Sequence, residues 1–212
     1  MFEFSSKTQV NRDLKLSELF KLMHADKSLK ADAQNIKYVH MTNALSERTT
    51  GLKSDEVVNE IYVIQVLLEK EPVPYDFLRA LDKTINFQTM FEVWANGKVK
   101  YMTAFKSFSD GKQSQTKLVE TPFATLQKDE MPLVSSLQDL YKAMLTKISG
   151  LAFRQGETIK NWQVRLVEIE KLEKDFKKIE KQIDAESQPK QKFALNEQLR
   201  ELYSKIKELK CL

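Results

Sequence analysis

The sequence contains little cysteine, glycine and proline, and it lacks long apolar runs. Cys211 is the only cysteine among 212 residues, which excludes a disulfide framework and a cysteine-based zinc site. No stretch approaches the ~20 apolar residues of a membrane-spanning helix. The first residues do not have the pattern of a signal peptide. We therefore expect a cytoplasmic protein.

Signatures of common catalytic and cofactor sites are also missing. The sequence has no P-loop, no dinucleotide-binding fingerprint and no G-x-S-x-G. Its two histidines, His24 and His40, stand at no metal-ligand spacing. We therefore expect neither a metal nor a cofactor. The net charge of +4 permits contact with nucleic acid but does not require it.

The stretch from Glu60 to Phe105 predicts the centre of the fold. Residues 60–68 are rich in β-branched and aromatic side chains, as in a buried strand. After Pro72 and Pro74, residues 75–85 have helical spacing, and two apolar runs follow, joined by Asn96-Gly97. Asn-Gly favours a type I′ hairpin turn, in which Trp94 would face Val99, Phe91 would face Met102 and Met90 would face Thr103.

Flanking segments complete a first region of residues 1–150. Helical spacing predicts helices over 16–23 and 135–148, and strand-like runs cover 36–45 and 115–121. The fold class is therefore α+β, a small mixed β-sheet with flanking helices.

A second region, residues 151–212, predicts an antiparallel helical hairpin or coiled coil. Its apolar residues step by three and four in two series that mirror each other about Pro189. We place the loop at Ser187–Lys190, because proline is unfavourable within a helix. The alternative is that these are two unrelated amphipathic helices, each packed on the first region of the chain. Folding back would pair the members of one seam: Ile169, Leu172, Phe176, Ile179 and Ile183 with Leu209, Ile206, Leu202, Leu199 and Leu195.

Several segments together resemble a known family. A helix ends in Asp82-Lys83-Thr84-Ile85, and the following hairpin ends in Phe105-Lys106. Val10-Asn11-Arg12 lies near the start, and the tail carries Leu-Asn-x-x-Leu-Arg-x-Leu at residues 195–202. In this order the segments resemble the bacterial and archaeal domain of unknown function 4391. Members of that family are often encoded beside DNA methyltransferases and helicase-like proteins of restriction or phage-defence loci, so the resemblance implies a partner subunit.

The expected order of elements is also compatible with a PD-(D/E)xK nuclease core. Such a nuclease needs an aspartate on one strand and Glu/Gln-x-Lys on the next. Gln65 is present, but Leu67 stands where the lysine belongs, and residues 36–45 contain no carboxylate. The sequence therefore favours a degenerate relative of the nuclease fold over an active one.

Binding residues are easier to nominate than catalytic ones. Lysines near Tyr101 could follow phosphates while the aromatic ring stacks on bases. The alternative is a sheet edge that lysines protect from aggregation. On the helical hairpin, Trp162, Leu166 and Ile169 are the candidate contacts with a partner. The candidate nucleic-acid contacts are Lys98, Lys100, Lys106, Lys112, Lys117 and Tyr101.

The resulting hypothesis is a non-catalytic scaffold subunit of a DNA restriction or phage-defence assembly. It would dock a larger methyltransferase, helicase or nuclease. The alternatives are a metal-dependent or degenerate nuclease and a stand-alone nucleic-acid-binding protein. Contact with DNA, and pairing with another copy through the helical hairpin, stay open.

Overall fold

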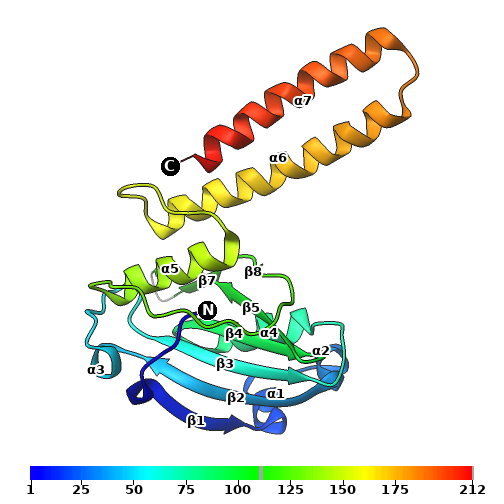
Figure 1. Cartoon of the computed structure of the whole chain (residues 1–212). Coiled ribbons are helices and arrows are strands. Elements are labelled where there is room, and N and C mark those ends of the chain that lie inside the picture. Colours follow the sequence, from blue (N-terminus) through cyan, green and yellow to red (C-terminus); the bar gives the residue numbers. More distant parts are fainter. Residues whose placement is uncertain (110–111, 212) are drawn as a thin grey trace. The chain divides into compact units, whose positions relative to one another are not determined.

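The computed structural model describes residues 1–109 and 112–211, with only the backbone at positions 108, 109, 112 and 113. The chain divides into two compact units, Met1–Gly150 and Leu151–Leu212. We call them the body and the hairpin unit and describe each by itself; Figure 1 labels their elements. None of the helices in the described residues is both long and apolar enough to cross a bilayer.

The body contains a six-stranded mixed sheet of order β1-β2-β3-β4-β5-β8. Only β3 and β4 are parallel; the other neighbours in this sheet are antiparallel. A ribbon of β6 (Lys106–Ser109) and β7 (Lys112–Gln115) stands apart from it. The strands of the main sheet are β1 (Gln9–Leu14), β2 (Ile36–Leu45), β3 (Ile61–Leu68), β4 (Gln88–Ala95), β5 (Lys98–Ala104) and β8 (Val119–Glu120).

The centre of the sheet forms as the sequence predicts. Parallel strands need a crossover connection, and α4 (Tyr75–Thr84) supplies it between β3 and β4. Asn96 and Gly97 have φ values of 51° and 72°, as a type I′ turn requires. The register of β4 and β5 pairs Trp94 with Val99, which confirms the predicted hairpin. The other two predicted pairs, Phe91 with Met102 and Met90 with Thr103, are confirmed as well.

The two faces of the sheet carry different layers, because successive side chains of a strand point to opposite sides. On the first face, Ile64, Phe91 and Met102 belong to a core with residues of α1 (Leu16–Leu22), α2 (Lys27–Asp32) and α4. On the second face, the Thr103 and Tyr141 hydroxyls are 2.9 Å apart, which places α5 (Leu137–Ser149) there. The predicted α+β class is confirmed.

Some local predictions differ from the structure. The strand β1 was not predicted, because its edge position leaves nearly all of its side chains exposed and removes the apolar alternation. The expected strand over 115–121 is divided between the end of β7 and β8. A short helix, α3 (Glu47–Thr50), lies in the connection between β2 and β3.

The hairpin unit consists of α6 (Ile159–Ala185) and α7 (Pro189–Lys210), which pack against each other. The predicted loop was wrong at its second end, because Pro189 begins α7 instead of lying in the loop. Proline suits the first turn of a helix, where its missing N–H leaves no hydrogen bond unmade. The loop is therefore residues 186–188.

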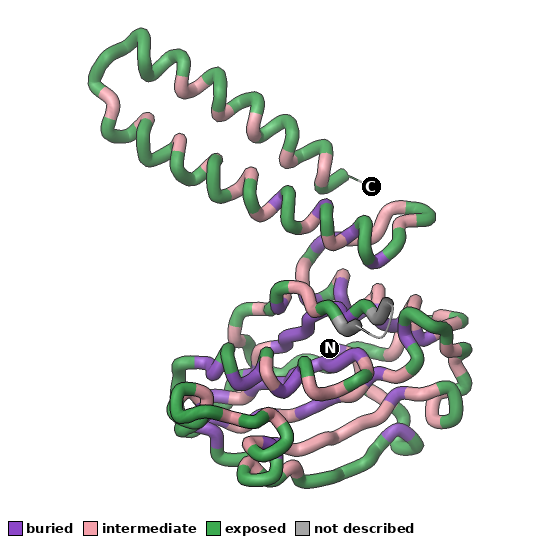
Figure 2. Tube along the Cα trace, turned by 180° about the vertical axis from the view of Figure 1, so that it is seen from behind, coloured by how far each residue is buried: buried purple, intermediate pink, exposed green. Residues whose placement is uncertain are grey.

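The predicted seam residues are less exposed than the rest of these helices. Ile169 is buried, and the other residues assigned to the seam are half-buried. Figure 2 shows the matching alternation of pink and green along both helices, with purple near the start of α6. This pattern fits a two-helix seam, while the individual residue pairs stay a prediction.

We predict that Phe176→Lys opens the hairpin unit. A lysine at this half-buried position would have to desolvate its ammonium against apolar neighbours. Amide hydrogen exchange measured by mass spectrometry should become faster across 172–205, whereas Lys177→Gln, at an exposed neighbouring position, should leave it unchanged. Equal exchange in both variants would contradict the seam.

Candidate functional site

Among the predicted nucleic-acid contacts whose side chains the structure describes, some are exposed and others are buried. Lys98 and Lys117 are exposed. The Lys100 side chain is only 12% exposed, and its Nζ lies 3.2 Å from Glu120 Oε1. Tyr101 is buried and, by strand alternation, points to the opposite face from Lys100. The side chain of Lys112 lies outside the described residues.

Lys106 is the clearest correction, because it is fully buried and cannot reach nucleic acid. Its ammonium donates to Asp82 Oδ1 at 2.8 Å and to Thr89 Oγ1 at 3.0 Å. It also donates to the Asp82 and Ile85 carbonyl oxygens, each at 3.0 Å. A cation is favourable at these carbonyls because they form the negative end of α4. Lys106 therefore joins α4 to the sheet.

Glutamine side chains complete this buried network. Gln115 Nε2 donates to the second carboxylate oxygen of Asp82. Gln88 Oε1 accepts from the Lys106 backbone N–H at 3.0 Å, and Gln88 Nε2 donates to the Lys106 carbonyl at 2.8 Å. Burial raises the pKa of Asp82 and lowers the pKa of Lys106, and each charge opposes the shift of the other. The carboxylate of Asp82 and the ammonium of Lys106 therefore have hydrogen-bond partners within the chain, and their burial keeps both groups away from a substrate.

The geometry around Gln65 gives little support to a nuclease site. Gln65 pairs in register with His40 of β2 and Glu92 of β4. The His40 Nδ1 atom is 2.6 Å from Asp13 Oδ1, on the exposed edge strand. Across residues 1–109 and 112–211, no group of three His, Cys, Asp or Glu side chains is arranged to hold a metal ion.

In the hairpin unit, the proposed anchor Trp162 is buried. Its ring stacks on Phe153 with centroids 4.9 Å apart, and its Nε1 donates to the Leu151 carbonyl at 3.0 Å. Ile169 is also buried, and Leu166 is half-buried. Trp162 and Ile169 were therefore wrongly assigned to a partner-binding surface, because their burial in the folded chain is already complete.

Sequence reasoning missed Arg165, which links the start of α6 to the end of α7 by hydrogen bonds. Arg165 donates to both carboxylate oxygens of Glu157, at 2.8 and 2.6 Å. It also donates to the carbonyls of Ala152 and Leu209, so it connects α6 to the last turn of α7. Its spacing could have indicated that it is buried, because Arg165 lies four residues before Ile169 and so continues the apolar seam of α6.

Exposed apolar side chains are the feature of this unit that could contact another protein. Val164 and Val167 are 63% and 60% exposed near the start of α6. Phe193 and Tyr203 on α7 are 67% and 60% exposed. Aromatic side chains are enriched among the residues that dominate protein–protein interfaces.

Comparison with known proteins identifies a family. The sequence model of the domain of unknown function (DUF4391) matches residues 2–206. This chain belongs to the DUF4391 family. Asp82 and Lys106, from two of the segments that carry the family resemblance, are the partners of the buried ion pair. No curated protein and no solved structure matches the chain.

We predict that Lys106→Met destabilises the body by about 3–5 kcal/mol, because Asp82 would be left buried without its cation. Urea unfolding measures this loss. The double variant Asp82→Leu, Lys106→Met should lose less than the sum of the two single variants, because it removes both charges. Lys98→Met, on exposed Lys98, should change stability by no more than about 0.5 kcal/mol. Additive effects would contradict the pairing.

A pH dependence follows from Glu157. Its hydrogen bonds with the Arg165 guanidinium lower the pKa of Glu157 below its ordinary value of 4.5. The ionised form is therefore favoured by folding, and its contribution is present above pH 4.5 and lost as pH falls through the folded pKa.

We expect the urea midpoint of the hairpin unit to fall between pH 5 and about pH 3, followed by Trp162 fluorescence in a Trp94→Phe background. Glu157→Gln should remove part of this dependence. Glu168→Gln, at an exposed position on α6, should retain it. A full dependence in Glu157→Gln would contradict the assignment.

Proposed function

We propose that this protein is a non-catalytic interaction subunit of a DNA restriction or phage-defence assembly. In this proposal it docks a larger methyltransferase, helicase or nuclease. The single observation that carries the interaction role is the set of exposed apolar side chains on a hairpin whose seam is already filled. The kind of partner rests on the family resemblance.

The exposed residues suggest which part of the hairpin unit is the contact. Val164 and Val167 are three residues apart on α6 and therefore share a face. They lie close in the sequence to Trp162 and Arg165, whose ring stacking and ion pair fix the start of α6. A rigid support lowers the entropy cost of association. We therefore place the docking surface at Val164 and Val167 and expect Phe193, near the tip, to be less important.

The body supports the same role. Its buried pair, Asp82 and Lys106, is occupied in holding α4 against the sheet. A nuclease alternative would need a metal-binding set of side chains, which the described residues do not provide. A nucleic-acid-binding alternative would need the lysines to share a surface, whereas Lys106 is buried and Lys100 is paired with Glu120.

Affinity capture from the native host, followed by reconstitution with the purified captured protein, tests the proposal. We expect the wild-type chain to retain a methyltransferase, helicase or nuclease. Val164→Ser with Val167→Ser should weaken its binding at least tenfold, whereas Phe193→Ser should have little effect. Circular dichroism of each variant controls for folding. Loss of binding in Phe193→Ser alone would reverse the assignment, and a binary complex with an unrelated protein would overturn it.

Incubation of the purified protein with plasmid and Mg²⁺ or Mn²⁺ distinguishes the nuclease alternative. We expect intact plasmid. Cleavage that Gln65→Ala abolishes would replace the scaffold proposal with an enzymatic one.

A further inference from the structure

The outer face of α6 carries a cluster of lysines that the linear sequence conceals. A coiled-coil helix directs its a and d residues into the seam and its b, c and f residues away from it. Counted from the seam residues Ile169 and Phe176, every outward position between 171 and 181 holds lysine. We call this set the lysine face, and all of its members are exposed: Lys171, Lys174, Lys177, Lys178 and Lys181.

The carboxylates of the same stretch lie elsewhere on the helix. Glu173, Asp175 and Glu180 occupy the positions beside the seam. The Oε1 atom of Glu173 lies 2.6 Å from Lys210 Nζ, so this carboxylate is directed toward α7. Within the described residues, the ammonium groups of the lysine face have no ion pair or hydrogen bond. Folding therefore sorts an alternating run of charges into a face of one sign.

The outer face of α7 has no comparable excess of one charge. Acidic and basic side chains alternate along it, so their fields largely cancel. Its outward positions between 197 and 208 are Glu197, Arg200, Glu201, Ser204, Lys207 and Glu208. A polyanion is therefore attracted to α6 and not to α7.

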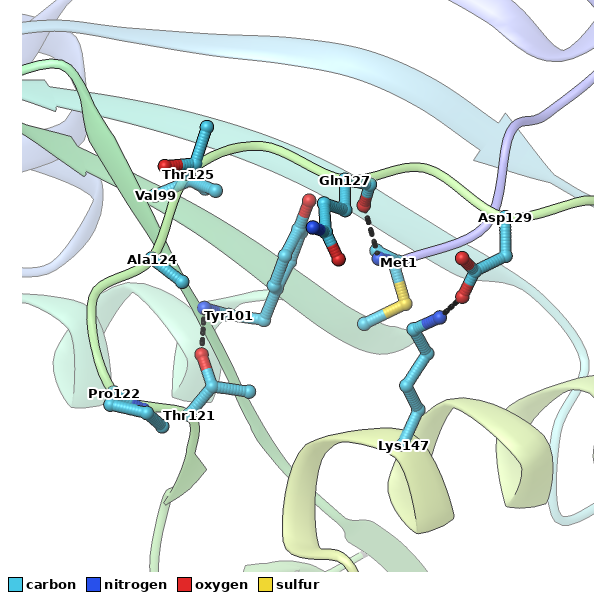
Figure 3. A pocket seen from close by; sticks show the side chains of 10 residues that line it. All are labelled: Met1, Val99, Tyr101, Thr121, Pro122, Ala124, Thr125, Gln127, Asp129 and Lys147. Carbon is cyan, nitrogen blue, oxygen red and sulfur yellow. Dashed lines mark hydrogen bonds and ion pairs between the residues drawn. The ribbon is translucent and has the colours of Figure 1, made fainter.

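Cations of the body differ from the lysine face because they already have partners. Figure 3 shows a cavity of about 200 Å³ at which Lys147 forms an ion pair with Asp129. The amino group of Met1 donates to the Gln127 carbonyl at 2.9 Å in the same cavity. These contacts neutralise or use the positive groups there, so the cavity is a poor place for a second anion.

The dimensions of the lysine face suit a nucleic-acid duplex. Its ten-residue span covers about 15 Å of helix, and lysines three and four residues apart repel one another. Duplex DNA carries one charge per ~1.7 Å of its axis, so the same length presents roughly nine phosphates. A lysine is a compact charge on a flexible stem, which can reach a phosphate without exact alignment. Phosphates would thus relieve the repulsion within the face.

The composition of the face argues against other polyanions. Single-stranded nucleic acid is bound with the help of aromatic rings, and this face has none. Lysine is depleted at protein–protein interfaces, and helices that bind a membrane surface need an apolar face. Over this stretch the apolar side chains of α6 lie in the seam with α7. Arginine, asparagine and glutamine, the usual readers of bases, are also missing from the face.

We propose that the lysine face binds double-stranded DNA through its phosphates and without reading the base sequence. The proposal goes beyond the docking of a protein partner, because it needs only this chain. Val164 and Val167 precede the lysine face on the same outer side of α6. A partner docked there would lie next to the bound duplex.

Fluorescence anisotropy of a labelled DNA duplex, titrated with the purified full chain at several KCl concentrations, tests the proposal. Five phosphate contacts predict that log K falls against log [KCl] with a slope of about −4.5. Two duplexes of unrelated sequence should bind equally. Lys171→Gln, Lys174→Gln and Lys178→Gln together should weaken binding at least tenfold and reduce the slope to about −1.8.

A matched variant separates the lysine face from the net charge. Lys190→Gln, Lys205→Gln and Lys207→Gln together remove three exposed lysines of α7, and they lower the net charge from +4 by the same three units. This variant should keep its affinity within about twofold, because three of the five proposed contacts are not touched. Arginine at 171, 174 and 178 should restore both affinity and slope. Circular dichroism of every variant controls for folding.

Three results would overturn the proposal. The first is the absence of saturable binding at low salt. The second is an equal loss of affinity in the α6 and α7 variants, which would reduce the effect to net charge. The third is competition by poly-L-glutamate as effective as that by unlabelled duplex, which would assign the face to an acidic protein.

Discussion

The body depends on satisfying the charge of one buried lysine. Lys106 begins the β6–β7 ribbon, with one residue between it and the end of β5, while Asp82 is in the last turn of α4. Their contact therefore fixes the crossover helix, the central hairpin and the ribbon relative to one another. From β4, the Gln88 side chain forms hydrogen bonds with the backbone N–H and carbonyl of Lys106. Burying two charges costs several kcal/mol each unless their hydrogen bonds are made, so these elements must assemble together.

The structure explains why some of this fold could be predicted and some could not. The β4–β5 register follows from Asn96-Gly97, because few other residues adopt two successive positive φ values. The seam of the hairpin unit follows from local helical spacing. Lys106 could not be placed in the same way, because a lysine after an apolar run is normally a surface residue. Its partner is 24 positions away in the sequence.

The candidate sites show the same limit. Sequence reasoning found the apolar residues of α6 but assigned Trp162 to a partner and overlooked Arg165. The Trp162 ring is occupied by Phe153, and Arg165 is occupied by Glu157 and the end of α7. Likewise, the lysines of α6 share one face only because the helix and its seam direct them outward. Local patterns identify which residues are apolar or charged, whereas availability for binding depends on which contacts folding has already used.

The central claim is that Lys106 is an internal structural residue, held by its buried ion pair with Asp82 and out of reach of nucleic acid. Brief acetylation of the native full-length protein, read by mass spectrometry with and without DNA, tests it most directly. The account predicts rapid labelling of Lys98 and negligible labelling of Lys106 under both conditions. Labelling of Lys106 at the rate of Lys98, with protection by DNA, would contradict it.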